Sequence, residues 1–195
     1  MPVLHIETTA GCPRTPVLLL ALEEVGAAYR VELRPHGWFD VHHGGPGPAL
    51  HVDGEVRVGL EPLLEHVRQL PGLRPGADDL ARADRWFDRL AALRRTIARI
   101  GAARRAGAAP AAEDLASVAG FTAMLEDELG ARAWLGGDSP CAADIALSFL
   151  GVLAKMGVAL GPRATGWLAR LHGREAWLRV RAAFPGAAAL ELPRG

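Results

Sequence analysis

Short apolar runs and one helical segment alternate over the first part of the chain, a pattern typical of a small α/β domain. Residues 3–8 form a short apolar run that ends in a turn-like segment, which predicts a buried strand. Residues 15–26 carry strong helix formers and predict a helix that Thr15 caps and Gly26 ends. Residues 29–35 alternate between polar and apolar positions, which predicts a second strand. Two strands joined by a helix imply a βαβ unit with a right-handed crossover.

A hairpin and a further helix complete the predicted α/β domain. Residues 49–58 contain two strand-like segments around an Asp-Gly pair, which is a strong hairpin signal. Residues 61–70 predict a closing helix, whereas residues 36–48, rich in Gly, Pro and His, predict a loop. The order β-α-β followed by β-β-α therefore defines a predicted domain over residues 1–70.

Helical periodicity dominates the rest of the chain. Residues 71–76 hold two prolines and two glycines and predict a linker. Beyond it, apolar residues recur at three- and four-residue steps over residues 80–100 and again over residues 115–129. The predicted fold class is therefore α/β + all-α, with an all-helical domain over residues 77–195. We expect its tail, residues 185–195, to be loosely ordered.

The composition fits a folded protein without a large charged surface. Half of the 195 residues are hydrophobic, which supplies a sizeable core. The 22 basic and 22 acidic residues cancel, so we expect neither nucleic acid nor an anionic membrane as a partner. The sequence shows no signal peptide and no apolar run long enough to cross a bilayer, so we expect a cytoplasmic location.

Neither the cysteines nor the histidines show the spacing of a metal site. Two cysteines, Cys12 and Cys141, in a chain of this size do not indicate a disulfide framework. The seven histidines are scattered apart from the His42-His43 pair, so we expect no metal ion.

Cys12 is the main candidate for chemistry because it lies between the first predicted strand and the first predicted helix. A helix N-terminus favours an anion, since its dipole and free N–H groups lower the pKa of a thiol placed there. Arg14 adds a positive charge nearby, and the hydroxyls of Thr8, Thr9 and Thr15 can donate to a thiolate. Cys12 is therefore a candidate nucleophile or hydrogen-bond donor, and the alternative is a small residue packed in a turn.

Four local motifs carry a resemblance to a known family. Residues 12–26 begin with Cys-Pro and continue as a helix that ends in "ALEEVG", and Gly47-Pro48 precede the predicted hairpin. Residues 141–147 have the spacing of an S/T-x-x-D capping box, and residues 166–185 contain a "W…R…R" pattern. Together with the order of elements, these motifs resemble the glutathione S-transferase superfamily, in which a thioredoxin-like domain precedes an all-helical domain. The resemblance covers nearly the whole chain.

The resemblance implies roles for several of these residues. Cys12 falls at the family's catalytic Ser or Cys position. Pro48 matches a cis proline, which in thioredoxin-like folds presents the preceding backbone amide, here that of Gly47, to a thiol ligand. Asp144 matches the acidic residue of the capping box, whose role is in folding, while Cys141 replaces the usual hydroxyl and leaves the box degraded.

One departure from the family affects glutathione binding. Many members carry Glu-Ser after the hairpin, where a helix N-terminus binds the γ-glutamyl carboxylate. Gly59 and Leu60 stand at those positions, and neither offers a side-chain hydrogen bond to a carboxylate. Glu61 follows one or two positions late, so the glutathione-binding motif is degraded, with Leu60 and Glu61 as the candidate contacts that remain.

Further candidates for ligand contact come from the positions of clefts in relatives. Trp38 and His43 lie in the predicted loop that borders the ligand cleft, with core packing and plain solvation as their alternatives. Trp86 and Arg89 lie on the long helix that closes the electrophile pocket in relatives, although Trp86 alternatively faces the other domain or a dimer partner. The basic run 94–105 resembles a phosphate-binding patch, but its apolar periodicity favours a solvated helix face.

The resemblance implies a transferase that activates a thiol for attack on a small apolar electrophile. Its cofactor would be glutathione or another low-molecular-weight thiol, and its partner a second copy in a homodimer. The degraded motif leaves two alternatives open. One is a glutathione-independent enzyme of the same fold, an isomerase, lyase or cyclase that acts on a specialised metabolite. The other is a non-catalytic binding module.

Overall fold

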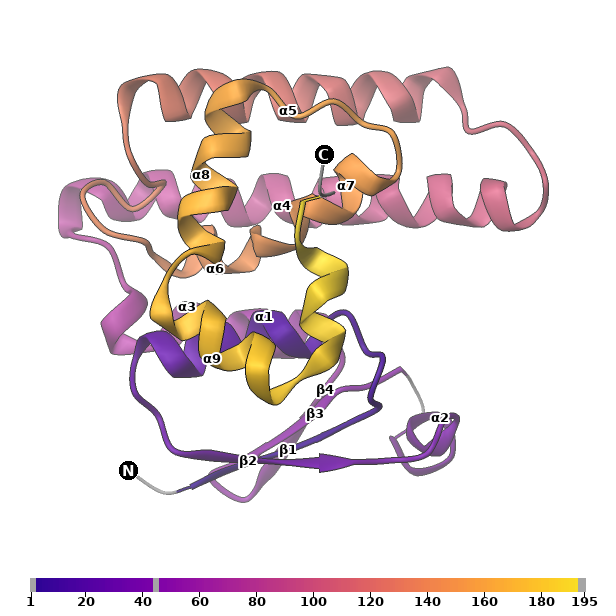
Figure 1. Cartoon of the computed structure of the whole chain (residues 1–195), viewed down its shortest axis with the longest axis vertical. Helices are drawn as coiled ribbons and strands as arrows, with labels where there is room; N and C mark the ends of the chain where they lie inside the picture. The colour runs from indigo at the N-terminus through magenta and orange to yellow at the C-terminus, as the bar shows by residue number, and fades with distance from the viewer. Residues whose placement is uncertain (1–2, 44–45, 193–195) are drawn as a thin grey trace.

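The computed structural model of the chain describes residues 3–43 and 46–192. Within these ranges four strands form one sheet, and they are β1 (Leu4–Thr8), β2 (Tyr29–Leu33), β3 (Ala49–Val52) and β4 (Glu55–Val58). Their order across the sheet is β2-β1-β3-β4 (Figure 1). β1 and β2 run parallel, whereas β3 runs antiparallel to β1 and to β4. The βαβ and hairpin units predicted from the sequence are both present.

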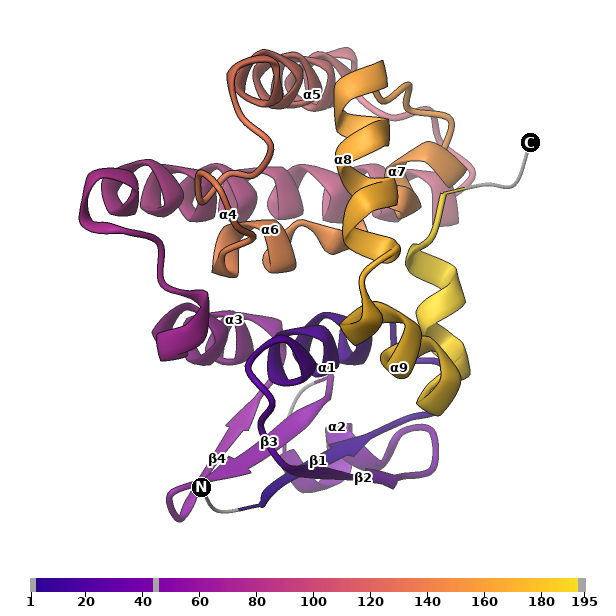
Figure 2. The same ribbon diagram turned by 60° about the vertical axis from the view of Figure 1, so that its left-hand side comes forward.

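Helices α1 (Thr15–Glu24) and α3 (Leu60–Gln69) lie on one face of the sheet and separate it from the later helices (Figure 2). A short helix, α2 (Trp38–His43), connects β2 to β3. The sequence predicted only a loop there, and this was wrong. Stacking at i,i+4 spacing explains the helix, because the rings of Trp38 and His42 lie 4.4 Å apart.

The turn between β3 and β4 has the geometry that its Asp-Gly pair predicts. Asp53 (φ 51°) and Gly54 (φ 80°) both have positive φ, as a type I′ turn requires. Val52 therefore pairs directly with Glu55.

Helices make up the chain from residue 71 onward, which confirms the predicted α/β + all-α class. No helix in residues 3–43 and 46–192 is long and apolar enough to span a membrane. The elements are η1 (Pro71–Leu73), α4 (Ala77–Arg105), α5 (Ala112–Ala131), α6 (Ala142–Ala146), η2 (Ser148–Leu150), α7 (Gly151–Lys155), α8 (Pro162–His172), α9 (Glu175–Ala183) and η3 (Pro185–Leu190).

The C-terminal segment is more ordered than the sequence predicted. Leu190 is fully buried, and the Lys155 ammonium donates to the backbone oxygens of Ala188 and Ala189 at 2.9 and 3.0 Å. The expectation of a loosely ordered tail was therefore wrong up to Leu192, and residues 193–195 lie outside the described residues.

The part of the chain that holds the sheet, α1 and α3 (the sheet side) and the part that holds the later helices (the helical side) share a continuous apolar core. α9 returns to lie beside α1 (Figures 1 and 2), where the Arg174 guanidinium donates to both carboxylate oxygens of Glu24 at 2.6 and 2.8 Å. Because packing is continuous across the two parts, the domain limits at residues 70 and 77 stay a prediction.

A buried carboxylate fixes the start of α6. The Asp144 side chain accepts hydrogen bonds from the backbone N–H groups of Leu135, Gly136 and Cys141 and from the indole N–H of Trp167, at 2.8–3.3 Å. Asp144 is fully buried. The sequence predicted a capping box with one half degraded, and this was wrong, because both halves of the Cys141–Asp144 box are present. The Asp144 carboxylate also joins the preceding loop to α8.

Replacing Asp144 by alanine will destabilise the protein by about 3 kcal/mol or more, because several buried donors lose their acceptor at once. A single helix cap is worth only about 1 kcal/mol. Urea unfolding followed by circular dichroism measures the change. Asp138→Ala is the matched control, since Asp138 is exposed in the same loop. A loss of stability no larger than that of the control would contradict this role of Asp144.

A buried histidine will make stability fall in mild acid. Burial lowers the pKa of His172 to about 4, and its ring stacks on Trp177 at 4.1 Å. As pH falls below 6.5, the unfolded chain binds a proton that the folded chain excludes down to about pH 4, so the free energy of unfolding decreases. The full loss is about 3 kcal/mol. Urea unfolding between pH 6.5 and 5 should show a flatter dependence in His172→Gln, whereas the exposed His36→Gln should keep the wild-type slope. Equal slopes in His172→Gln and wild type would contradict this assignment.

Candidate functional site

Cys12 lies in the turn between β1 and α1, where its backbone N–H donates to the Thr9 oxygen at 3.1 Å. Its side chain is 8% exposed. It opens onto a cavity of about 580 Å³ that Thr9, Arg14, Gly47 and Phe39 also line. The structure thus brings together four sequence-predicted site residues, namely Thr9, Cys12, Arg14 and Gly47.

The Cys12 thiol faces a hydrogen-bond acceptor. Its Sγ lies 3.9 Å from the backbone oxygen of Gly47, and Arg14 Nη1 donates to the same oxygen at 2.9 Å. The Gly47–Pro48 peptide bond is cis. The hydrogen bond of the thiol goes to this carbonyl, and α1 begins three residues after Cys12, at Thr15. This arrangement places the Cys12 side chain as a hydrogen-bond donor to a backbone oxygen.

Gly47 is required by the close approach of Phe39 from α2. A Cβ atom at position 47 would lie 2.7 Å from the Phe39 ring, closer than van der Waals contact allows. Phe39 therefore fills the space that a side chain at position 47 would take.

Thr8 and Thr15 bond to each other and not to a ligand. Their hydroxyl oxygens are 2.5 Å apart, and both residues are fully buried. The prediction of catalytic or binding roles for these two hydroxyls was wrong, since the pair joins β1 to the start of α1. Thr15 also fails to cap α1, because it is the first helical residue and Arg14 precedes it without a side-chain cap.

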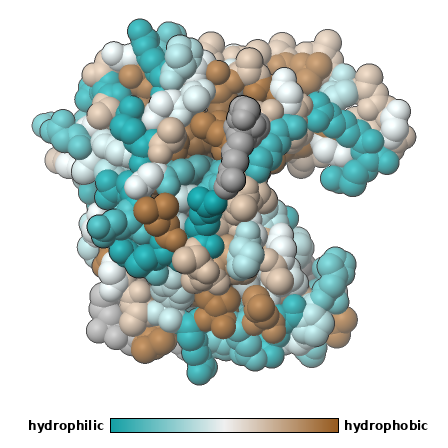
Figure 3. Space-filling view, viewed as in Figure 1, coloured by the Kyte–Doolittle hydropathy of each residue, from teal (hydrophilic) through white to brown (hydrophobic). Residues whose placement is uncertain are grey.

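A second cavity, of about 430 Å³, lies between the sheet side and the helical side and is called the interdomain cavity below. The space-filling view is hollowed there (Figure 3). Pro13 and Arg14 line both this cavity and the one beside Cys12. The interdomain cavity is mainly apolar, and α1, α3, α4, η2, α7 and η3 contribute Val17, Leu60, Leu64, Ile97, Phe149, Val152 and Leu190.

The start of α3 presents no free side-chain anchor for a carboxylate. Leu60 lines the interdomain cavity, and the carboxylate of Glu61 lies 2.7 Å from Arg94 Nη2 of α4. Arg94 and Arg95 themselves line this cavity. The interpretation of their basic run as a purely solvated helix face was therefore wrong for these two residues.

Trp38 and His43 lie on α2 and do not line either cavity in the described part of the chain. The Arg34 guanidinium lies over the Trp38 ring at 4.5 Å. His43 Nε2 lies 3.3 Å from Glu7 Oε2. Pro48 is buried behind Gly47. These residues support the cavity beside Cys12 and do not form its surface.

Among residues 3–43 and 46–192, Trp86 and Arg89 line neither of the two cavities, so the prediction for them was wrong. Trp86 is fully buried, with its ring edge-on to Phe121 at 5.6 Å. The Arg89 guanidinium lies over the Trp86 ring at 4.8 Å. α4 packs against both α5 and α6, which buries a wider face of the helix than its apolar stripe marks.

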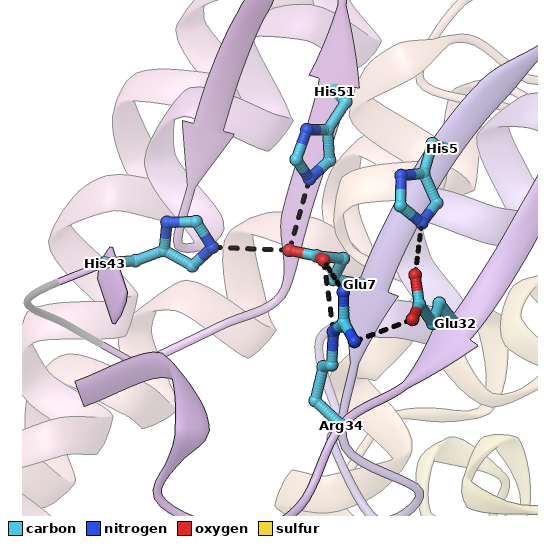
Figure 4. A network of polar contacts seen from close by, with 6 residues as sticks. All are labelled: His5, Glu7, Glu32, Arg34, His43 and His51. Carbon is cyan, nitrogen blue, oxygen red and sulfur yellow. Dashed lines mark hydrogen bonds and ion pairs between the residues drawn. The ribbon is translucent and has the colours of Figure 1, made fainter. Parts of the chain in front are cut away.

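A polar cluster that the sequence analysis missed lies on the sheet beside α2 (Figure 4). Glu7 bonds Arg34 through Oε1, while its Oε2 lies near His43 and His51. Burial raises the pKa of the Glu7 carboxyl, but contacts with Arg34, His51 and His43 outweigh it and hold the pKa at about 2. The sequence pattern that could have revealed this cluster is the alternation of side chains along β1, which places His5 and Glu7 on one face of the sheet.

Comparison with known proteins identifies similar solved structures. No protein-family model and no curated protein matches the sequence. A glutathione S-transferase from Actinobacillus pleuropneumoniae has a TM-score of 0.80 and 17% identity, covering 96% of this chain and 95% of that one. A theta class glutathione S-transferase from Xanthomonas axonopodis pv. citri with glutathione bound has a TM-score of 0.67 and 25% identity, covering 92% and 97%. Ure2p in complex with glutathione has a TM-score of 0.74 and 16% identity, covering 92% and 94%.

The two cysteines should differ in reactivity. Cys12 opens onto a cavity, whereas burial raises the pKa of the Cys141 thiol to about 12. We expect iodoacetamide to modify Cys12 alone in the native protein and both cysteines in urea, as measured by mass spectrometry. Cys12→Ser should give no native adduct. An adduct at Cys141 in the native protein, or none at Cys12, would contradict the exposure described above.

Proposed function

We propose that this chain, which has the fold of the glutathione S-transferase superfamily, is a transferase that brings a small thiol to an apolar electrophile. The observation that carries the proposal is the wall shared by the two cavities. Pro13 and Arg14 line both, so a thiol held beside Cys12 is next to a molecule in the interdomain cavity. Ligand sites often lie between domains in this way. Two of the similar structures contain glutathione, which supports a thiol of that kind.

The residues beside Cys12 supply the means to hold a thiolate. The Cys12 S–H is a donor, and Arg14 keeps further N–H donors besides the one bonded to Gly47. A thiol that binds here loses its proton to solvent, and the positive charge of Arg14 favours the anion left behind. The thiolate sulfur then forms a bond to the electrophilic carbon, and the leaving group departs with the bonding electrons.

A specific observation favours the second candidate, a glutathione-independent enzyme of this fold. Gly59 and Leu60 stand where relatives use Glu-Ser, and the nearby Glu61 carboxylate is engaged with Arg94. The usual binding site for the γ-glutamyl carboxylate is therefore missing its side chains. Such an enzyme would use the interdomain cavity for an isomerase, lyase or cyclase reaction. A homodimer and a cytoplasmic location are part of the proposal in both cases.

Retention on immobilised glutathione, with turnover of a chlorodinitrobenzene-type electrophile, separates the two candidates. Under the first, the protein is retained, and Cys12→Ala lowers kcat/KM by roughly 10–100-fold through loss of a donor to the thiolate. Cys12→Ser keeps most activity if Cys12 only donates. Cys141→Ser is the matched control and should retain wild-type kcat/KM. Neither retention nor turnover in the wild type would overturn the first candidate and favour the second.

A further inference from the structure

Two histidines stand directly opposite each other on neighbouring strands. His5 of β1 pairs in register with His51 of β3, and their rings stack at 4.8 Å. Side chains at directly opposite positions leave the same face of a sheet and reach the same volume. Both imidazoles point toward the carboxylates of Glu7 and Glu32 (Figure 4).

The two carboxylates divide their oxygens between an arginine and the histidines. Arg34 bonds Oε1 of Glu7 through Nε at 3.1 Å, and its Nη1 lies 2.6 Å from Oε1 of Glu32. The Oε2 atoms face the histidines instead, with His5 Nε2 at 2.9 Å from Glu32 and His51 Nε2 at 3.2 Å from Glu7. Arg34 thus holds both carboxylates in place and leaves one oxygen of each beside imidazole nitrogens, because Glu7 Oε2 also lies 3.3 Å from His43 Nε2.

Three of these side chains have ligand atoms near enough to converge on one metal ion after a small shift of the side chains. Ligands at about 2.0–2.1 Å from a tetrahedral zinc ion lie roughly 3.3 Å from one another. The ligand atoms of His5, Glu7 and Glu32 all lie within 4.8 Å of one another. His51 Nε2 lies close to Glu7 Oε2, yet this buried nitrogen makes no well-directed hydrogen bond to any described residue. Its position beside Glu7 makes His51 the fourth candidate ligand.

The charge and the donor set are suited to the same kind of ion. Two carboxylates and one guanidinium leave the cluster with a formal charge of −1 when its histidines are neutral. Imidazole and carboxylate ligands together favour zinc or a similar transition metal over calcium or magnesium. A residue outside the donor set that orients the ligands, as Arg34 does here, is typical of such sites.

We propose that His5, His51, Glu7 and Glu32 form a binding site for a divalent transition-metal ion, zinc in the first place. Four protein ligands close the coordination sphere, so the ion would be structural. It would join β1, β2 and β3 on the face of the sheet opposite α1 and α3. None of these four residues lines either cavity in the described chain, so the site does not rest on the proposed function. The sequence predicted no metal, because the four ligands come from three strands.

Metal titration of the untagged full chain tests the site. The protein is stripped with a chelator and titrated with Zn²⁺ against a chromophoric chelator, and Co²⁺ reports the ligand geometry through its visible absorption. We expect one Zn²⁺ per chain, a rise in Tm, and an absorption spectrum typical of tetrahedral Co²⁺. His5→Gln, His51→Gln and Glu32→Gln should each weaken Zn²⁺ binding at least tenfold.

The matched control is His36→Gln, which changes an exposed histidine outside the cluster and should bind Zn²⁺ like the wild type. Glu32 lies at the edge strand with its side chain 45% exposed, so Glu32→Gln gives a folded variant if a histidine variant fails to fold. Absence of Zn²⁺ binding to the wild type would overturn the proposal. Binding that the three cluster variants leave unchanged would also overturn it.

Discussion

The buried carboxylate of Asp144 fixes α6, one of the elements through which the helical side meets the sheet side. It joins the loop before α6 to α8 through backbone donors and the indole of Trp167. α6 in turn packs against α1, α3 and α4. Ala146, the last residue of α6, lines the interdomain cavity. Asp144, which lines neither cavity, thus helps to position the wall of the interdomain cavity that Ala146 forms.

The cavity beside Cys12 is shaped by a backbone oxygen. Both the thiol of Cys12 and the guanidinium of Arg14 are directed at the Gly47 carbonyl. Phe39 closes the other side of Gly47 and leaves no room for a side chain there. The polar character of this cavity therefore comes from groups already oriented by the fold, which reduces the cost of ordering them around a ligand.

Local patterns predicted most of the fold, because strands and helices reveal themselves by periodicity. The α1 helix, the hairpin and the long α4 helix all follow from spacing. The cavity beside Cys12 was predicted through the family resemblance of Cys12 and Pro48. A pocket closed by the long helix was also expected from the resemblance, but much of its lining was not, because Val17 and Phe149 meet only through helix packing that no local pattern encodes. Trp86 was misassigned for a related reason, since contact with a second helix buries residues beside the apolar stripe.

Arg14 is a physical connection between the two cavities. Its guanidinium borders both and also bonds the Gly47 carbonyl. A ligand that draws this group toward one cavity changes the charge and shape of the other. By linkage, the second ligand must then alter the affinity of the first by the same factor. An enzyme built on this wall, in which one substrate moves Arg14, would bind its two substrates with synergy or antagonism.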